Sequence, residues 1–192
     1  MVRACWANTG RRSHTADSIV ENSAVQSEVM CLTEEPPSAN DPTPATGTIP
    51  TVDRFVTGSS ERAMFDNVAF QPHTGNLVVL EDGAVDVVTP QGAAKRGNDI
   101  WMCLPDGDDD DTLSDGCVRI ASIRDTTAEP SGFIFLGSGE EALVHIQHRK
   151  VNDDAGAGNH GALVRISGFD IRRHYDHRRG HDRDRDRERT QR

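Results

Sequence analysis

The 192-residue sequence contains no run of about 18 apolar residues, the length that a membrane-spanning helix requires. No apolar segment follows Arg11 and Arg12, so the start of the sequence does not have the pattern of a signal peptide. Apolar residues make up only 35% of the chain, aromatic residues 5%, and the mean hydropathy is −0.59. This composition predicts a small folded core and chain ends that do not contribute to it.

Positive charge is scarce in the body of the chain. The formal net charge is −10, but residues 171–192 carry nine Arg against five Asp or Glu, so residues 1–170 carry −14. A nucleic-acid-binding surface needs clustered positive charge, and the acidic body therefore argues against nucleic acid as a partner. Acidic loops suit divalent cations instead. The alternating Arg and Asp near the C-terminus are typical of a solvated low-complexity tail.

The four cysteines include no Cys-x-x-Cys pair, which argues against a structural zinc site. Cys103 and Cys117 flank the acidic loop LPDGDDDDTLSDG between two strand-like segments, so an antiparallel hairpin would bring them close together. The pattern leaves two outcomes open: a Cys103–Cys117 disulfide, or two free buried thiols. A disulfide would indicate an oxidising compartment.

Strand signals organise the chain around residues 65–83, FDNVAFQPHTGNLVVLEDG. Two short apolar strands are joined by a Pro-x-Thr-Gly-Asn turn, with Asp66 at the entrance and Glu81 and Asp82 at the exit. A hairpin brings its two ends together, so these three carboxylates are expected within reach of one cation. The pattern returns in residues 129–149, EPSGFIFLGSGEEALVHIQHR, and more weakly in residues 28–35, EVMCLTEE.

The repeated hairpins predict an all-β fold, a partial β-propeller of about two to three blades of antiparallel four-stranded sheet with disordered termini. The expected organisation is a disordered N-terminal segment 1–27, a partial propeller 28–171 and a charged tail 172–192. Further strands are expected at 51–57, 98–104, 116–123 and 162–169, and one short strand is expected within residues 84–97, AVDVVTPQGAAKRG. Alternate turns of such meanders lie on one face, which is expected to gather Asp66, Glu81, Asp82, Glu129 and His148.

Two interpretations of the acidic positions stay open. Asp66, Glu81, Asp82 and Glu129 can each be ordinary turn or strand-end residues, or together they can bind a metal. Their recurrence at equivalent hairpin ends favours the two interpretations about equally. The loop 106–115 has the composition of a calcium loop, but it lacks the closing glutamate of an EF-hand. A solvated acidic turn is the interpretation that this spacing favours.

The segments FDNVAFQPHTGNLVVLEDG, GNDIWMCLPDGDDDDTLSDGC and AEPSGFIFLGSGEEALVHIQHR resemble the C-terminal part of the PhoX-type alkaline phosphatases. The resemblance covers residues 28–169, and its most specific motif is the Glu-Pro-Ser-Gly start with the Gln-His exit. It implies an exported β-propeller, periplasmic or secreted, that hydrolyses phosphate monoesters at a site dependent on calcium and iron. It also implies four metal ligands, Glu81, Glu129, Asp66 and Asp82. His148 and Arg149 are the implied contacts to the phosphate ester.

The sequence also departs from that family. A propeller needs about four blades or more to close, and the repeats supply fewer. The expectation is therefore a truncated phosphatase-like domain, inactive alone, whose exposed sheet edges pair with the missing blades or with another chain. Without a signal peptide, the chain as it stands is expected in the cytoplasm. The alternative is a non-catalytic calcium-binding propeller module that acts as a scaffold or interaction surface.

Overall fold

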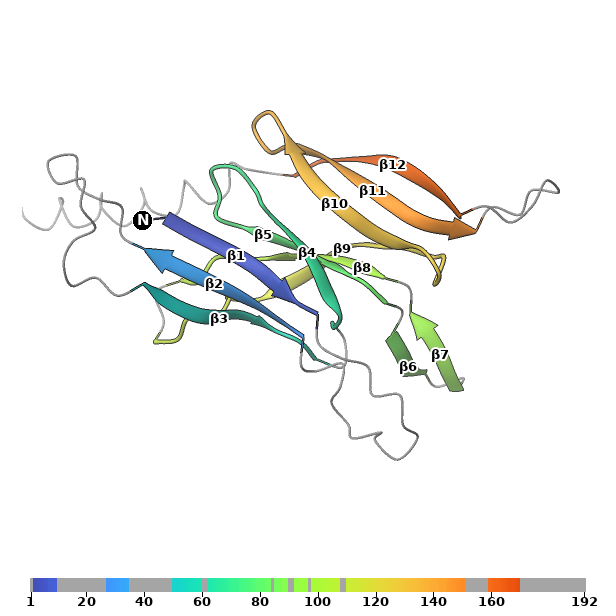
Figure 1. Ribbon diagram of the computed structural model, residues 1–192, viewed down its shortest axis with the longest axis horizontal. Helices are drawn as coiled ribbons and strands as arrows, with labels where there is room; N and C mark the ends of the chain where they lie inside the picture. The colour runs from blue at the N-terminus through green and yellow to red at the C-terminus, as the bar shows by residue number, and fades with distance from the viewer. Residues whose placement is uncertain are drawn as a thin grey trace, which may run out of the picture.

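The computed structural model describes residues 2–9, 27–34, 50–59, 62–83, 85–89, 92–96, 98–107, 110–150 and 159–169 (Figure 1). All regular elements in these ranges are β-strands, which form three antiparallel sheets and a separate two-stranded ribbon. The all-β prediction is confirmed. These ranges contain no helix, and therefore none that is long and apolar enough to cross a membrane.

Each of the three sheets is a meander whose strands follow one another along the chain. The first sheet has the order β1 (Val2–Asn8), β2 (Glu28–Glu34), β3 (Thr51–Thr57). The central sheet has the order β4 (Phe65–Phe70), β5 (Leu77–Glu81), β8 (Asp99–Cys103), β9 (Cys117–Ser122). The third sheet has the order β10 (Glu129–Leu136), β11 (Glu141–Lys150), β12 (Asn159–Ser167). The ribbon inserted between β5 and β8 consists of β6 (Val85–Thr89) and β7 (Gly92–Arg96).

Strand β1 corrects the prediction that residues 1–27 are disordered. It pairs with β2 from Val2 opposite Glu34 to Asn8 opposite Glu28. The segment was missed because a single seven-residue strand shows no sustained period, and its order comes from its partner strand. The rest of the predicted disordered segment, residues 10–26, lies outside the described residues, and so does the charged tail.

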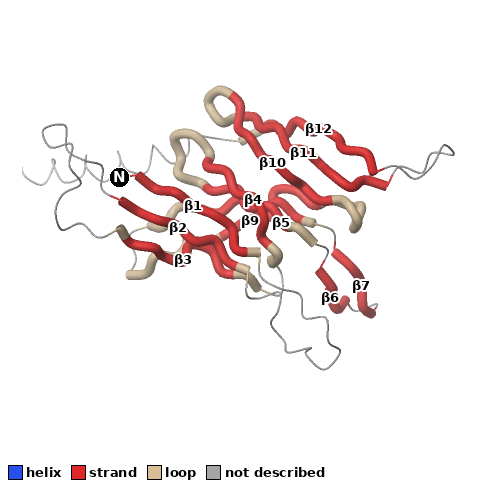
Figure 2. The backbone as a smooth tube through the Cα atoms, in the orientation of Figure 1, coloured by secondary structure: helices blue, strands red, loops and turns tan. Residues whose placement is uncertain are grey.

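The central sheet lies between the other two, and two apolar cores hold the three layers together (Figure 2). The first core, between the first and central sheets, contains Val29, Cys31, Phe55, Val56, Phe65, Leu77, Val79, Trp101 and Cys103. The second core, between the central and third sheets, contains Val78, Leu80, Ile100, Ala128, Phe133, Ala142, Val144 and Ile146. Strand β5 is buried along its whole length because its residues alternate between these two cores.

The first strands of the three sheets lie side by side. Strand β1 contacts β4, and β10 contacts both β4 and β5. Residues at the ends of β4, β5 and β10 are therefore brought close together, although they come from distant parts of the chain.

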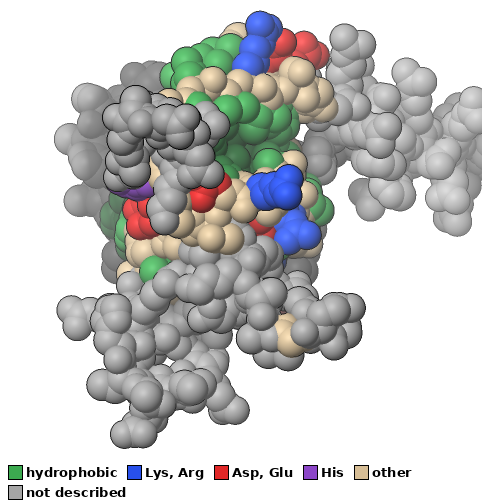
Figure 3. Space-filling model, turned by 90° about the vertical axis from the view of Figure 1, so that its right-hand side faces the viewer, with side chains coloured by type: hydrophobic (Ala, Val, Ile, Leu, Met, Phe, Trp, Pro, Cys, Tyr) green, Lys and Arg blue, Asp and Glu red, His purple; other side chains and the backbone are tan. Residues whose placement is uncertain are grey.

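Each of the outermost sheets has one face that no other described sheet covers. Side chains alternate along each strand, and Cys5 and Cys31 face the first core. Trp6 and Val52 therefore point away from it and are 44% and 51% exposed. On the third sheet, Ile134 and Leu163 face outward and are 60% and 68% exposed. In the view of Figure 3, hydrophobic side chains gather over the upper part of the molecule, where the third sheet lies in Figure 1.

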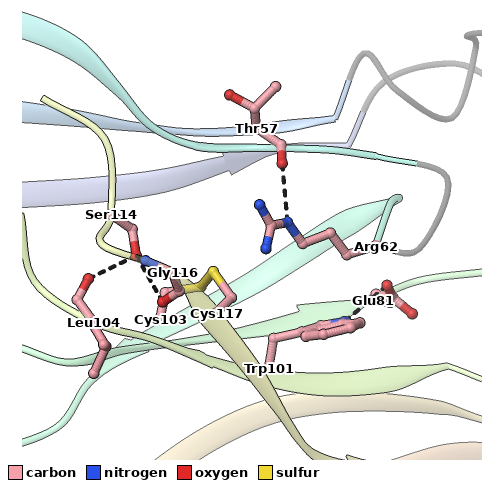
Figure 4. The surroundings of a disulfide bond; sticks show 9 residues. All are labelled: Thr57, Arg62, Glu81, Trp101, Cys103, Leu104, Ser114, Gly116 and Cys117. Carbon is pink, nitrogen blue, oxygen red and sulfur yellow. Dashed lines mark hydrogen bonds between the residues drawn. A yellow bond between two sulfur atoms is a disulfide. The ribbon is translucent and has the colours of Figure 1, made fainter. Parts of the chain in front are cut away.

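Two disulfides join neighbouring strands on the side of the first core. Cys103 is bonded to Cys117 between β8 and β9, so that of the two outcomes left open the structure has the disulfide. Cys5 is bonded to Cys31 between β1 and β2, a pair that the sequence did not suggest. Next to the Cys103–Cys117 bond, the Ser114 hydroxyl donates a hydrogen bond to the Leu104 carbonyl at 2.8 Å. This contact fixes the loop that follows β8 (Figure 4). Disulfides form and persist in oxidising compartments.

Candidate carboxylate site

Three of the predicted acidic residues lie close together where the central sheet meets β10. Asp66 is the second residue of β4, Asp82 directly follows β5, and Glu129 begins β10. The Glu129 carboxyl is hydrogen-bonded to the Asp82 side chain, and the charges of Asp82 and Asp66 both act on it. This carboxylate cluster, defined as Asp66, Asp82 and Glu129, is the candidate functional site.

The cluster has an unusual protonation state. Burial, the hydrogen bond to Asp82 and the negative charges of Asp82 and Asp66 together raise the pKa of Glu129 from 4.5 to about 8. Burial and the charge of Asp82 also raise the pKa of Asp66. Glu129 therefore keeps its proton at neutral pH. A divalent cation would supply the positive charge that these oxygens lack.

His148 lies at the rim of the cluster. Its Nε2 atom is 3.8 Å from Glu129 Oε1, and its side chain is 54% exposed. It sits at an irregularity in the pairing of β11 with β12 and has a φ of 59°, a left-handed conformation that is uncommon for a residue with a side chain. Arg149 follows it in β11, where its backbone pairs with that of His160. The contact of the Arg149 side chain with a phosphate group stays a prediction.

Glu81 does not join the cluster. Its side chain is fully buried, and Oε1 accepts hydrogen bonds from Ala63 N at 3.0 Å and Trp101 Nε1 at 2.9 Å (Figure 4). Its Oε2 accepts a third bond, from Asp99 N at 3.0 Å. This geometry corrects the expectation that Glu81 shares one cation site with its sequence neighbour Asp82. In the structure Glu81 is a buried anchor for three backbone and side-chain donors.

The alternation of side chains along β5 explains the separation. Glu81 lies on the same side of β5 as Leu77 and Val79, and its side chain faces the first core, next to Trp101. The next residue, Asp82, is turned to the other side, where β10 begins. Adjacent carboxylates at the end of one strand therefore have different surroundings.

Asn98 positions the cluster and was missed in the sequence. It is 3% exposed, its Oδ1 accepts from Gly83 N at 2.8 Å, and its Nδ2 donates to Ala128 O at 2.7 Å. It thus ties the residue after Asp82 to the residue before Glu129. A buried Asn between Gly97 and a strand resembles an ordinary loop residue, and only the fold reveals that both halves of its amide are used.

A backbone in an uncommon conformation also supports the cluster. Met64 has a φ of 56°, its N–H donates to Ser27 Oγ at 2.6 Å, and its carbonyl accepts from Asp82 N at 2.7 Å. A left-handed conformation at such a residue costs on the order of 1–3 kcal/mol, and functional sites often contain such residues. Two residues with uncommon backbone conformations, Met64 and His148, therefore lie beside the carboxylate cluster.

The acidic loop of residues 106–115 forms contacts with its own backbone. Asp111 Oδ1 accepts from Leu113 N at 2.7 Å, and Asp115 Oδ1 accepts from Gly107 N at 3.3 Å. Such short-range bonds are typical of turns. In the part of this loop that the structure describes, the solvated-turn interpretation accounts for these carboxylates.

Across the described ranges, no group of three or more His, Cys, Asp and Glu side chains is arranged so that it could hold a metal ion. The carboxylate cluster is therefore at most a partial ligand set. Comparisons with protein-family models, with curated proteins and with solved structures find no match for the chain. The functional argument consequently depends on the geometry of the cluster.

Proposed function

We propose that the chain is a partial β-propeller whose carboxylate cluster contributes to a divalent-cation site, with calcium as the metal and a phosphate monoester as the substrate. The observation that carries the proposal is the convergence of three carboxyl groups, from the start of β4, the end of β5 and the start of β10, close enough for Asp82 and Asp66 to contribute to the raised pKa of Glu129. Oxygen-rich, negatively charged sites of this kind are the ones that calcium prefers.

The arrangement of the sheets supports the propeller interpretation. Three consecutive meanders pack face to face, and their first strands lie side by side, as the innermost strands of propeller blades do. The cluster is at the ends of two of these first strands and beside a third segment, Asp82, which leaves β5. In a propeller, such a position opens into the central channel.

The residues of the cluster suggest a division of roles. Asp66, Asp82 and Glu129 would hold the cation, and a bound calcium ion would neutralise the charge of a phosphate group and activate an oxygen nucleophile. His148, at the rim, would contact the phosphate together with Arg149, the next residue along β11. The same roles follow from the resemblance to PhoX-type alkaline phosphatases, in which iron is the second metal.

The ligand set supports a limited activity for the chain alone. Calcium takes about six to eight oxygen ligands, and the cluster has three carboxyl groups. Further ligands must come from water, from the phosphate ester or from another chain. We therefore expect weak turnover or none from the isolated chain. A calcium-binding module without catalysis is the second candidate, and the incomplete ligand set is the observation that favours it.

The test combines calcium titration calorimetry with hydrolysis of p-nitrophenyl phosphate in the presence of calcium, with and without iron. We expect calcium binding that weakens about tenfold or more in Glu129→Gln and Asp82→Asn, since each loses a charged ligand. Glu141→Gln, a partly exposed glutamate paired with Arg165 on the third sheet, is the matched control. Binding with turnover identifies a hydrolase, and binding without turnover identifies the module. If the wild-type chain and both variants show no calcium binding, the proposal is wrong.

A further inference from the structure

The outer face of the first sheet carries apolar side chains on all three strands, together with the ion pair of Arg54 and Glu28. Its cross-strand register sets Ala4 beside Leu32 and Leu32 beside Val52, with Trp6 beside Met30 in the adjacent row. Trp6 and Val52 are about half exposed. Large apolar side chains at neighbouring positions on one sheet face mark an interaction surface more strongly than scattered ones do.

The outer face of the third sheet also combines large apolar side chains with an ion pair, between Glu141 and Arg165. Ile134 lies opposite Leu143, and Leu163 lies on the next strand in the same outward direction. Ile134 and Leu163 are the two most exposed large apolar side chains of the described residues. The stack of three sheets thus ends on each side in a face that combines exposed apolar side chains with one ion pair.

We infer that a second copy of this chain covers both faces, so that two copies form a closed ring of six sheets. In this ring, the outer face of the first sheet of each copy packs on the outer face of the third sheet of its partner. The inference rests on the blade interpretation proposed above, but on neither calcium nor the phosphate ester.

The packing inside the chain indicates this arrangement. The step from the first sheet to the central sheet, face to face with first strands adjacent, is repeated from the central sheet to the third. The same step taken once more from the third sheet would reach the first sheet of another copy. Propellers typically contain about four to eight blades. One copy supplies fewer, two copies supply six and three copies exceed the range.

The size of the faces favours a closed ring over a single contact. With strands of seven residues, a rise of about 3.3 Å and a spacing of about 4.8 Å, the face of the first sheet covers about 330 Å². One junction then buries about 660 Å² over both partners, less than the roughly 1,000 Å² that a specific interface needs. The two junctions of a ring bury about 1,300 Å² and pass this threshold.

The test measures the mass of the full-length chain by sedimentation velocity and light scattering. We expect a dimer of the 21.0 kDa chain. Val52→Glu on the first face and Leu163→Glu on the third should each raise the dimer dissociation constant about 100-fold, because each places a charge inside both junctions. Val118→Glu, at an equally exposed strand position outside both faces, should leave the dimer unchanged.

An equal mixture of the two face variants separates the ring from other dimers. Each variant keeps one intact face, so the mixture can form one wild-type junction and should associate more tightly than either variant alone. A dimer that joins like faces behaves differently, since one variant would then dimerise as well as the wild type. That result, or a wild-type monomer at about 100 µM, well above the Kd range of specific complexes, would overturn the inference.

Two further measurements keep the outcome interpretable. Circular dichroism and the milder pair Val52→Thr and Leu163→Thr show whether a lost dimer reflects lost folding. Calcium titration of the same variants reports the cluster separately. A monomer that still binds calcium contradicts the ring alone, and a dimer that binds none contradicts only the metal site.

Discussion

Replacing Glu81 with Gln distinguishes a structural anchor from a metal ligand. In the structure, the Glu81 carboxylate accepts one bond from Asp99 N at Oε2 and two bonds at Oε1. A Gln side chain keeps one oxygen, which best serves the two donors Ala63 N and Trp101 Nε1. Its amide nitrogen then faces the N–H of Asp99, donor against donor.

The expected cost follows from these contacts. A hydrogen bond to a charged group contributes about 1.5–3 kcal/mol, and a buried donor left without an acceptor costs about 1–3 kcal/mol. These contributions overlap, and we expect Glu81→Gln to lower the free energy of unfolding by about 2–4 kcal/mol. For a chain of this size, this corresponds to a decrease in Tm of about 5–15 °C.

The assay is thermal and urea unfolding followed by circular dichroism, with calcium titration well below the Tm of the variant. Glu141→Gln is again the control, because Glu141 forms a solvent-exposed pair with Arg165 whose loss should change stability by less than about 1 kcal/mol. We expect Glu81→Gln to lose stability while its folded fraction binds calcium like the wild type. A variant with the wild-type Tm and a tenfold weaker calcium affinity would refute the anchor role.

Other substitutions test the remaining parts of the structure. The folded-state pKa of Glu129 is raised, so the folded chain holds a proton that the unfolded chain loses above about pH 4.5, and stability falls as the pH rises to about 8. Glu129→Gln should therefore match the wild type at pH 4 and exceed it at pH 9 by about 1–2 kcal/mol after solvent screening, as urea unfolding at both pH values will show. Replacing both Cys103 and Cys117 by Ala releases a 14-residue loop and should lower the free energy of unfolding by about 3 kcal/mol in the same assay. Gly139→Ala places a Cβ atom 2.9 Å from the β4–β5 turn at a φ of 91° and should cost about 1–3 kcal/mol, whereas Gly137→Ala, with open space around it, should cost less in a comparison of Tm values.

Local patterns were sufficient to predict most strands. Alternating or continuous apolar runs correspond to β2, β3, β4, β5, β8, β9, β10, β11 and β12, because both the strand period and the turn chemistry are properties of neighbouring residues. Strand β1 was missed because only its pairing with β2 orders it. The segment between β5 and β8 was expected to hold one short strand and contains the β6–β7 ribbon instead.

The site was predictable as a group but not residue by residue. The meander rule brought Asp66, Asp82, Glu129 and His148 to one region, and the structure has them together. The same rule included Glu81, because it assigns residues to an end of a strand and not to a face. The pairing of β4 with β5 also shifts register between Phe65 and Asn67, which the sequence does not reveal.

The protonation of Glu129 and the binding of a cation are linked through the same oxygens. A ligand carboxyl must lose its proton to coordinate calcium, so calcium and the proton compete at Glu129. With a pKa of about 8, the carboxyl is protonated in roughly nine of ten molecules at pH 7, which weakens the apparent calcium affinity about tenfold relative to pH 9. Weak binding at neutral pH is thus what a genuine site in this cluster would give, and an alkaline optimum for any hydrolysis would arise from the same titration. At high pH, repulsion among these ionised carboxylates lowers the stability of the metal-free chain. The same negative charge attracts a divalent cation. Both effects arise because the fold brings the carboxyl groups at the ends of β4, β5 and β10 together.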